Sequence, residues 1–326
     1  MLVISRQHQS FHNDVFTNFN QYIRAGDCLV LNDTRVFPAR LQALCGSAAI
    51  EVVLLCALNP GETQWRVLVK PGKRVLPGGE LIFSNDLRAE VLLKGEFGER
   101  ILQFFAKRPI RDLLDRLGAT PLPPYIRRPP TPEDSERYQT VFAQHRGSVA
   151  APTAGLHFTS EMLELCRAAG ADLAYLTLHV GLGTFAPIRE KNLADIRLHE
   201  EYFEISETSA TKMRAAQRLL CVGTTSVRTI ETAMLRSGIE AMSRSGIQAM
   251  SRGGLRAMQG ETNLFISPGF QFRATGALLT NFHLPQSSLL MLVCAFAGRE
   301  LTLAAYRHAV AEKYRFFSYG DCMLIC

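Results

Sequence analysis

The chain has 326 residues, of which 47% are hydrophobic and 20% are charged, and it carries a formal net charge of +6. This composition is typical of a globular protein and excludes an intrinsically disordered one, and the length predicts one large domain or two smaller ones. The basic excess is compatible with a nucleic-acid partner but does not demand one, because many proteins of this size carry the same excess.

Cysteine spacing and hydropathy argue against a zinc-binding, a secreted and a membrane-spanning protein. The eight cysteines form no CxxC pair and no Cys/His cluster with zinc spacing, so we expect reduced thiols and no metal. Residues 1–8 contain no long apolar run, which argues against a signal peptide. The longest apolar run, Leu289 to Ala297, is shorter than the roughly 20 residues that span a bilayer. We therefore expect a cytoplasmic protein with no membrane partner.

The first predicted element is a buried strand at Cys28–Leu31, which ends at a polar segment. From about Arg40 to Ala106, short β-prone runs alternate with turn signals rich in Gly, Pro, Asn and Asp. Evenly spaced short strands are typical of a small antiparallel barrel or sandwich. The sequence therefore predicts a β-barrel domain at 41–109, inserted into a domain made of residues 1–40 and 110–326.

The second half of the chain alternates between strand and helix patterns. A helix at Ile110–Leu117 precedes the extended segment Pro121–Pro124. We then expect four strands, at Leu173–Val180, Leu219–Val222, Ala277–Thr280 and Cys322–Ile325. We also expect four helices: one at Ser160–Ala169 with Ser160 as the N-cap, one that passes through Arg228 and Glu231, one at Ser287–Ala297 and one at Leu301–Tyr314. This alternation predicts an α/β fold with a mainly parallel sheet flanked by helices.

A tandem repeat interrupts this pattern. The segment Arg236–Ser243 recurs as Arg244–Ser251 and, more loosely, as Arg252–Gln259. A period of eight residues matches neither helix nor strand, and the copies contain Gly. We interpret the repeat as a local duplication in an exposed connection with little function.

Four polar motifs directly follow predicted strands. They are Asp33–Arg35, His179–Phe185, Gly223–Arg228 and Asn281–Pro285. Because ligands bind at the carboxyl ends of parallel strands, we expect these motifs to meet in one site. The alternative for each motif by itself is an ordinary turn or helix cap.

The motif at Gly223–Arg228 combines a Gly, three hydroxyl residues and a predicted helix start. Free backbone N–H groups at a helix start favour a phosphate or a hydroxyl ligand. The motif is not a P-loop, because no Gly-Lys-Ser/Thr follows. Its alternative role is simple N-capping.

Histidines supply the acid–base candidates, because imidazole titrates near neutral pH. The histidines of interest are His157, His179 and His283, and a strand through His199 and Glu201 would place a carboxylate on the same face as a histidine. Each of these histidines could instead be a hydrogen-bonded structural residue, and the His199–Glu201 segment a solvated strand end.

The segment Glu312–Asp321 interleaves basic and aromatic residues. Such a pattern suits stacking on RNA bases with charge neutralisation, and Lys313, Arg315 and Tyr319 are its candidate contacts. The alternative is a helix end that packs its aromatic residues into the core.

Taken together, ten stretches of this chain resemble one enzyme family, the S-adenosylmethionine:tRNA ribosyltransferase-isomerases of queuosine biosynthesis. The stretches occur in family order and cover nearly the whole chain. They are LNDTRVFPARL from Leu31, PLPPYIRR from Pro121, DSERYQTVFA from Asp134, GSVAAPTAGLHF from Gly147, TLHVGLGTFAPI from Thr177, LHEEYFEI from Leu198, VGTTSVRTIE from Val222, LFISPGFQFR from Leu264, TNFHLPQSSLLMLVCAFAG from Thr280 and AVAEKYRFFSYGDCMLI from Ala309.

The resemblance implies an α/β domain that carries an inserted six-stranded β-barrel. It also implies a reaction in which the ribosyl group of S-adenosylmethionine is transferred to 7-aminomethyl-7-deazaguanine in tRNA and isomerised, with release of adenine and methionine. S-adenosylmethionine would be a consumed co-substrate, and no cofactor would be permanently bound. The expected partners are therefore this tRNA and S-adenosylmethionine, and we expect a monomer.

The resemblance also suggests roles for residues in the matching motifs. The expected acid–base groups are His157, His179, Glu201 and His283. The expected substrate-binding residues are Asp33, Arg35, Thr153, Gly181, Thr184, Thr224, Thr225, Ser226, Arg228 and Asn281.

Three other functions compete with this one. A conventional methyltransferase would show a Gly-rich turn with an acidic residue about 20 positions later, and none is convincing here. A sugar-phosphate enzyme could share the loop at Gly223 but leaves the other motifs unexplained. Because family members carry an extra segment before the strand that begins at Leu2, the remaining alternative is a degenerate or truncated paralogue that binds tRNA without catalysis.

Overall fold

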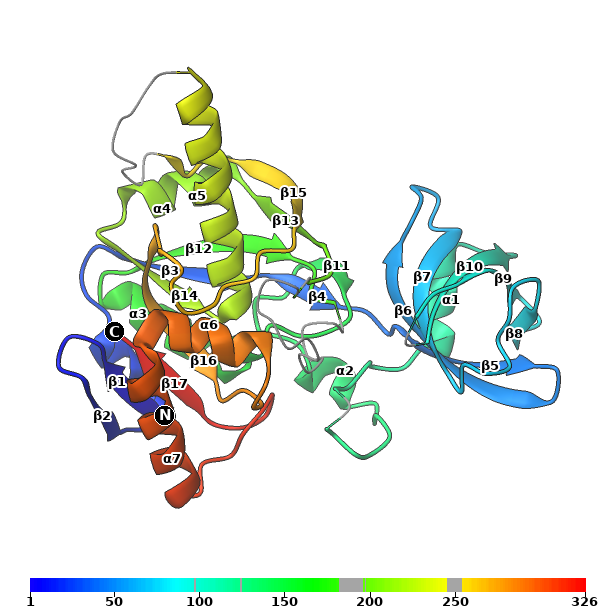
Figure 1. Ribbon diagram of the computed structural model, residues 1–326, viewed down its shortest axis with the longest axis horizontal. Coiled ribbons are helices and arrows are strands. Elements are labelled where there is room, and N and C mark those ends of the chain that lie inside the picture. Colours follow the sequence, from blue (N-terminus) through cyan, green and yellow to red (C-terminus); the bar gives the residue numbers. More distant parts are fainter. Residues whose placement is uncertain (97, 124, 182–195, 197, 245–253) are drawn as a thin grey trace. The chain divides into compact units, whose positions relative to one another are not determined.

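The computed structural model describes residues 1–326 except 97, 124, 182–195, 197 and 245–253 (Figure 1). The chain forms two compact units. The first contains residues 1–34, 140–145 and 152–326, and the second contains residues 35–139 and 146–151. The second unit is larger than the predicted segment 41–109, because it includes chain on both sides of the barrel strands.

A nine-stranded sheet is the centre of the first unit. Its strands, in spatial order, are β15 (Met258–Thr262), β13 (Glu201–Ile205), β12 (Asp172–Leu178), β3 (Asp27–Asn32), β14 (Arg218–Val222), β16 (Thr275–Asn281), β17 (Cys322–Ile325), β1 (Leu2–Ser5) and β2 (Ser10–Asn13). All six residues of β3 are buried. The continuous apolar run that predicted this strand is typical of a central strand covered on both faces.

The sheet is mixed, so the prediction of a mainly parallel sheet is wrong. The neighbouring strands β12, β3, β14 and β16 run parallel to one another, and β1 runs parallel to β17. The other four neighbouring pairs, β12–β13, β13–β15, β16–β17 and β1–β2, are antiparallel. Two helices, α6 (Ser288–Ala297) and α7 (Arg299–Ala311), lie between β16 and β17. Because two helices reverse the chain twice, β17 returns against β16 rather than along it.

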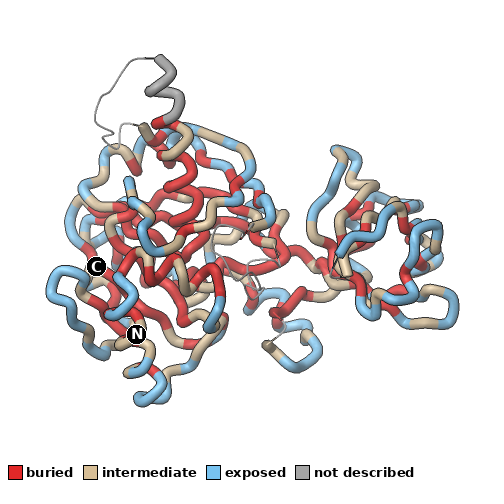
Figure 2. Tube along the Cα trace, viewed as in Figure 1, coloured by how far each residue is buried: buried red, intermediate tan, exposed pale blue. Residues whose placement is uncertain are grey.

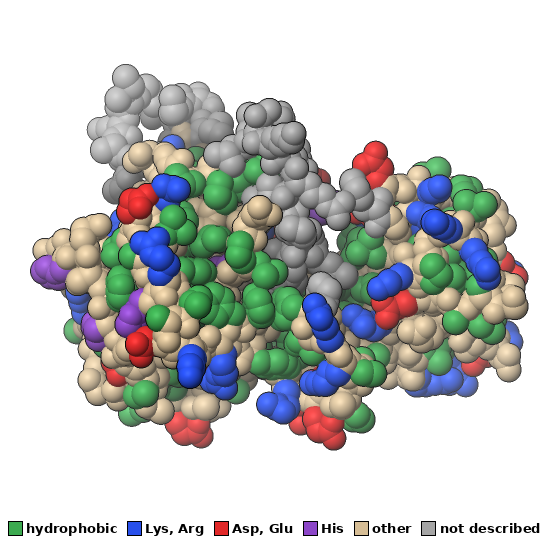
Figure 3. Space-filling view, turned by 60° about the horizontal axis from the view of Figure 1, so that its bottom comes forward, with side chains coloured by type: hydrophobic (Ala, Val, Ile, Leu, Met, Phe, Trp, Pro, Cys, Tyr) green, Lys and Arg blue, Asp and Glu red, His purple; other side chains and the backbone are tan. Residues whose placement is uncertain are grey.

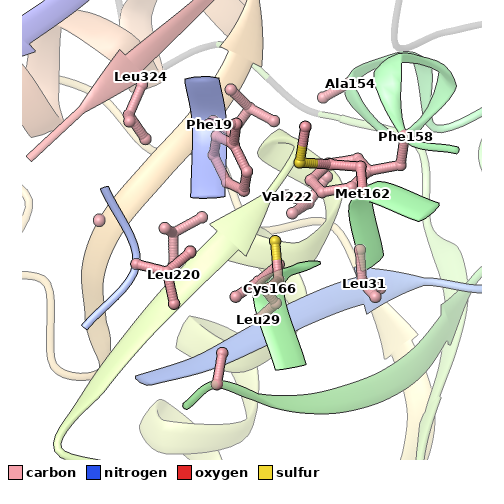
Figure 4. Close-up of a cluster of buried hydrophobic side chains, with 14 of the residues drawn as sticks. Phe19, Leu29, Leu31, Ala154, Phe158, Met162, Cys166, Leu220, Val222 and Leu324 are labelled. Carbon is pink, nitrogen blue, oxygen red and sulfur yellow. The ribbon is translucent and has the colours of Figure 1, made fainter. Parts of the chain in front are cut away.

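One face of the sheet packs into a cluster of buried apolar side chains (Figure 4). Alternate strand residues point to this side, including Leu29, Leu31, Leu220 and Val222, as the two-residue period of a strand requires. The helix α3 (Ser160–Ala168) and the 3₁₀ helices Phe16–Tyr22 and Thr153–His157 cover them. The helices α4 (Glu207–Ala215) and α5 (Thr224–Arg244) contact the same strands but contribute nothing to the cluster, so helices cover both faces.

Two local predictions need correction. The N-cap of α3 is Thr159, not Ser160, because the Thr159 hydroxyl accepts a hydrogen bond from the amide of Met162 at 3.2 Å. The first repeat copy, Arg236–Ser243, is not an exposed connection but the end of α5, where Ser237 is only 5% exposed. Extending an existing helix needs no new nucleus, which explains why a segment without helical period continues it. Residues 245–253 of the repeat lie outside the described residues.

The second unit contains a closed six-stranded antiparallel barrel, which confirms the predicted β-barrel. Its strands, in order, are β10 (Glu99–Ala106), β7 (Gln64–Lys70), β6 (Ala48–Ala57), β5 (Arg40–Cys45), β8 (Glu80–Ser84) and β9 (Leu87–Lys94). Burial alternates along β7, where Trp65, Val67 and Val69 are buried. Figure 2 shows buried, intermediate and exposed positions following one another along the chain of this unit. The predicted helix α1 (Ile110–Leu117) and a short α2 (Asp134–Arg137) complete this unit, and β4 (Thr34–Val36) pairs with β11 (His145–Ser148).

A buried carboxylate fixes α5 to the start of β16. Glu231 is fully buried and accepts hydrogen bonds from the amides of Arg273, Ala274 and Thr275 at 2.8, 3.1 and 2.9 Å, and from the Thr275 hydroxyl at 2.7 Å. Four donors satisfy the charge, as a buried carboxylate requires.

Replacing this carboxylate should destabilise the fold. We expect Glu231→Gln to lower the free energy of unfolding by about 2 kcal/mol, because its amide N–H₂ would face a backbone donor. The exposed Glu300, which pairs with the exposed Arg299, is the control, and Glu300→Gln should leave stability unchanged. Chemical denaturation measures both variants, and equal losses would contradict the assignment.

Candidate functional site

The four motifs that follow predicted strands lie at one edge of the sheet. They follow β3, β12, β14 and β16, which are neighbours in the sheet and run parallel. Their carboxyl ends therefore share an edge, as Figure 1 shows for the first unit. The described parts of the motifs therefore follow strands that end at this shared edge, and residues 182–185 of the second motif lie outside the described residues.

Hydrogen bonds join the ends of β3 and β12. The Asn32 side chain donates to the carbonyl of Leu178 and accepts from its amide, both at 3.0 Å. One residue later, the Thr177 hydroxyl donates to the Asp33 carboxylate at 2.7 Å. The Thr34 hydroxyl then lies 2.8 Å from Nδ1 of His179. These contacts hold two predicted site residues, Asp33 and His179, at neighbouring strand ends.

The His179 imidazole is neutral at neutral pH. Burial lowers its pKa to about 4, and the nearby His145 lowers it further. Its ring stacks on Tyr202 with 5.7 Å between centroids. The bond to Thr34 occupies Nδ1, and no partner of Nε2 is found within the described part of the chain. Because its lone pair is not blocked by a proton, this imidazole can accept one.

His145 was not predicted as a site residue. Its Nε2 lies 3.7 Å from the Asp33 carboxylate, and its carbonyl oxygen lies 3.4 Å from the Thr34 hydroxyl. Burial raises the pKa of Asp33, while the bond from Thr177 and the charge of His145 act in the opposite direction. His145 is far from Asp33 in sequence, in a segment without strand or helix periodicity, so no local pattern could have revealed it.

Glu201 is the first residue of β13 and forms a buried ion pair with Arg228 of α5. Its other carboxylate oxygen accepts the amide of Gly181 at 2.8 Å. Arg228 also donates from Nε to the carbonyl of Leu264 at 3.1 Å. The expected pairing of His199 with Glu201 on one strand face is wrong, because His199 is exposed and precedes the strand.

The motif after β14 forms the first turn of α5. Gly223 has a φ of +90°, a conformation that glycine adopts without strain. The Ser226 hydroxyl donates to the carbonyl of Val222 at 2.9 Å, so this hydroxyl helps to fix the turn. Thr224 and Thr225 are both 6% exposed.

The remaining two histidines lie near the end of β16. Nε2 of His157 lies 3.1 Å from Oδ1 of Asn281, whose amide nitrogen donates to the carbonyls of Phe317 and Ser318 at 2.8 and 3.1 Å. Because Oδ1 can only accept, Nε2 of His157 carries the proton and Nδ1 carries the lone pair. Burial lowers the pKa of His157.

His283 is held by two contacts. Its Nε2 lies 2.8 Å from the Thr280 hydroxyl, and its amide donates to the Tyr306 hydroxyl at 2.9 Å. Burial lowers its pKa to about 3, so this ring is also neutral at neutral pH.

The other predicted residues have varied surroundings. Thr153 begins the 3₁₀ helix that ends at His157, and Thr184 lies outside the described residues. Arg35 is exposed on β4 and belongs to the second unit. Near the C-terminus, Lys313 and Arg315 are exposed, Arg315 pairs with Asp321 at 3.1 Å, and Tyr319 is 38% exposed.

No group of three or more His, Cys, Asp or Glu among the described residues is placed to hold a metal ion. None of the described helices could cross a membrane by itself, although α6 and α7, bent by 115°, meet the length and hydropathy criteria as a pair.

Comparisons with known proteins agree on one family. Residues 1–325 match a family model described as "Queuosine biosynthesis protein". The chain is 49% identical to the S-adenosylmethionine:tRNA ribosyltransferase-isomerase of Solibacter usitatus and 46% identical to that of Syntrophotalea carbinolica, and in each case the alignment covers 100% of this chain and 92% of the relative. A solved S-adenosylmethionine tRNA ribosyltransferase of Thermotoga maritima has 36% identity and a TM-score of 0.50, with 100% of this chain and 91% of that one covered.

The depressed pKa of His179 predicts how stability depends on pH. The folded protein binds this proton only near pH 4, whereas the unfolded chain binds it near 6.5, so stability should fall as pH falls from 6.5 to 4. We expect His179→Asn to make the melting temperature less dependent on pH in this window, and the exposed His8→Asn to leave the dependence unchanged. Identical pH profiles for wild type and His179→Asn would refute the assigned shift.

Proposed function

Because the chain belongs to the queuosine biosynthesis protein family, we propose that it transfers the ribosyl moiety of S-adenosylmethionine onto 7-aminomethyl-7-deazaguanine at the tRNA wobble position and isomerises it. The product is epoxyqueuosine tRNA, and adenine and methionine are released. The observation that carries the proposal is the similarity, over the whole chain, to curated relatives that bear this activity in their names. S-adenosylmethionine is consumed as a co-substrate, and no permanently bound cofactor takes part.

The reaction makes three demands on the protein. A base removes a proton from the ribose carbon beside the sulfonium, a proton donor assists the departure of adenine, and the aminomethyl nitrogen reaches the sugar unprotonated. Neutral imidazoles suit the first and third demands, because each can take a proton at neutral pH.

His179 is the strongest candidate for the base. Its pKa is lowered to about 4, its orientation is held by Thr34 and Tyr202, and it stands at the carboxyl edge of the parallel strands. His157 carries its lone pair on Nδ1 and is the second candidate for proton transfer. His283 is the third, although its bonds to Thr280 and Tyr306 also suit a structural role.

Glu201 is better suited to positioning than to proton transfer. The Arg228 guanidinium and the Gly181 amide occupy its two oxygens, and both contacts stabilise the ionised carboxylate. A carboxylate held in this way fixes the backbone at Gly181 and orients Arg228.

The residues proposed to bind the substrates lie mostly at the same edge of the sheet. Asp33, Gly181, Thr224, Thr225, Ser226, Arg228 and Asn281 lie near the carboxyl edge of the strands, and with them we retain Thr153, Thr184 and Arg35. For tRNA, Lys313 and Arg315 would contact phosphates and Tyr319 would stack on a base, because all three are exposed. The activity belongs in the cytoplasm, where tRNA is modified, and we expect the protein to act as a monomer.

Release of adenine tests the function. Incubating the protein with S-adenosylmethionine and tRNA that carries 7-aminomethyl-7-deazaguanine should yield free adenine, free methionine and a heavier tRNA nucleoside, all measured by mass spectrometry. The His179→Gln variant, with folding verified by circular dichroism, should release adenine at least about 100-fold more slowly. If the wild-type protein binds this tRNA but releases no adenine, the alternative of a non-catalytic paralogue replaces the proposal.

A further inference from the structure

The start of α5 carries a set of buried donors that lack partners. The amides of Thr224, Thr225 and Ser226 belong to the first turn, which has no intrahelical acceptors, and no other acceptor for them occurs in the described residues. All three residues are at most 6% exposed, so bulk water does not replace the missing acceptor. Buried N–H groups without an acceptor are costly, and natural proteins rarely retain them without a ligand.

Two side chains on the same face of α5 add unpaired donors. The Thr225 hydroxyl is buried and has no hydrogen-bond partner among the described residues, and neither has Nη2 of Arg228, which is 3% exposed. The Thr225 oxygen lies 3.5 Å from the position that a Cβ would take on Gly223, which places it at the helix start. Arg228 follows one turn later, and long helical side chains lean toward the N-terminus, so its free nitrogen faces the same region.

From this set we infer that the α5 start binds an anionic oxygen group, and that the group is the methionine carboxylate of S-adenosylmethionine. The amides and the guanidinium can only donate, and the positive end of the helix dipole favours an anion. Glu201 already neutralises Arg228, so the site fits a single negative charge better than a polyphosphate. The assignment rests on the proposed function, because S-adenosylmethionine has one anionic group. A tRNA phosphate is the other source of the same chemistry.

The chain offers a matched pair of variants. Thr225→Val removes a hydroxyl that has no partner, whereas Thr229→Val removes one that donates to the Thr225 carbonyl at 2.9 Å, one turn later in the same helix. We expect Thr225→Val to raise the dissociation constant for S-adenosylmethionine about tenfold without lowering the melting temperature. Thr229→Val should lower the melting temperature and leave this constant unchanged.

Binding is measured by calorimetry on the whole chain, without turnover, so failure of the proposed function does not hide the result. Decarboxylated S-adenosylmethionine should bind wild type and Thr225→Val equally, because neither complex contains the carboxylate. If Thr225→Val weakens the affinity for tRNA and leaves the affinity for S-adenosylmethionine unchanged, the site binds a tRNA phosphate, and the carboxylate assignment is overturned. If Thr225→Val changes neither affinity, the anion site itself is refuted.

An independent observation concerns the second unit, where most of the basic excess lies. Residues 35–139 and 146–151 contain 17 Lys and Arg against 12 Asp and Glu. Lys70, the last residue of β7, and Lys73 and Arg74, in the loop between β7 and β8, are exposed, and no ion pair of theirs occurs in the described chain. The carboxylate opposite Lys70 in the strand register, Glu51, lies 3.5 Å from Arg40. Figure 3 shows Lys and Arg side chains spread over one face of this unit.

A buried arginine holds this loop in place. Arg100 takes an inward-facing position of β10, is 2% exposed, and donates from Nε to the carbonyl of Val75 at 2.7 Å and from Nη2 to that of Gly72 at 2.6 Å. Burial lowers its pKa, because the charge has lost its water. A buried charge whose acceptors are loop carbonyls restricts the loop and adds positive potential beneath it.

We propose that this loop contacts the phosphate backbone of the substrate tRNA. A preordered cluster of cations binds phosphates with less loss of side-chain and backbone freedom than a flexible one. The proposal depends on tRNA as the substrate and not on catalysis, so it is tested by binding.

The triple variant Lys70→Ala, Lys73→Ala, Arg74→Ala should weaken tRNA binding about tenfold or more, and its log–log salt dependence should become shallower by roughly two to three. The control triple, Lys107→Ala, Arg108→Ala, Arg116→Ala, removes the same charge from residues after the opposite end of β10 and should change both quantities much less. Equal losses of tRNA affinity in both triple variants would show that the effect comes from net charge alone. An unchanged salt dependence in the first triple variant would exclude the contact between this loop and the phosphates. Wild-type protein that binds no tRNA would instead refute the proposed function.

Discussion

The arrangement of the site depends on the hydrogen bonding of β3 to two parallel neighbours. Because β12 and β14 both run along β3, the chain leaves all three strands at the same edge, and β16 extends that edge by one more strand. Asn32, the last residue of β3 in this ladder, extends the pairing through its side chain to both backbone groups of Leu178, two residues beyond its partner Leu176. Residues distant in the sequence, such as Asp33 and Thr177, therefore meet without any contact that local sequence could encode.

The sequence predicted the elements better than their directions. Continuous apolar runs such as Cys28–Leu31 identified buried central strands, and short β-prone runs separated by turn signals identified the barrel segment. The antiparallel return of β17 could also have been predicted, because two consecutive helices before Cys322 had been recognised. The end of α5 in the repeat could not, since its period resembles no helix and the burial of Ser237 is a tertiary effect.

In the candidate site, too, the sequence predicted where the motifs lie but not the contacts that their residues make. The positions of the four motifs after parallel strands were sufficient to place them at one edge, since that follows from topology alone. The roles within the motifs needed the structure. Ser226 bonds to its own helix start, Glu201 pairs with Arg228, and His145 begins the short strand β11, which pairs with β4 and not with the main sheet. Burial then determines the chemistry, because it keeps the imidazoles of His179, His157 and His283 unprotonated at neutral pH.

The position of β17 has a consequence for how the chain is made. It lies between β16 and β1, and Leu2 pairs with Met323 while the amide of Cys326 bonds to the carbonyl of Ile4. During synthesis, β1 and β2 emerge first but have no place in the sheet until β17 follows. The barrel, whose strands are consecutive in sequence, can close long before that, whereas the sheet that carries the site must wait for its last strand. Until then, the growing chain can pair β1 only with β2, and the other edge of this apolar strand stays without a partner, which is a template for pairing with another chain.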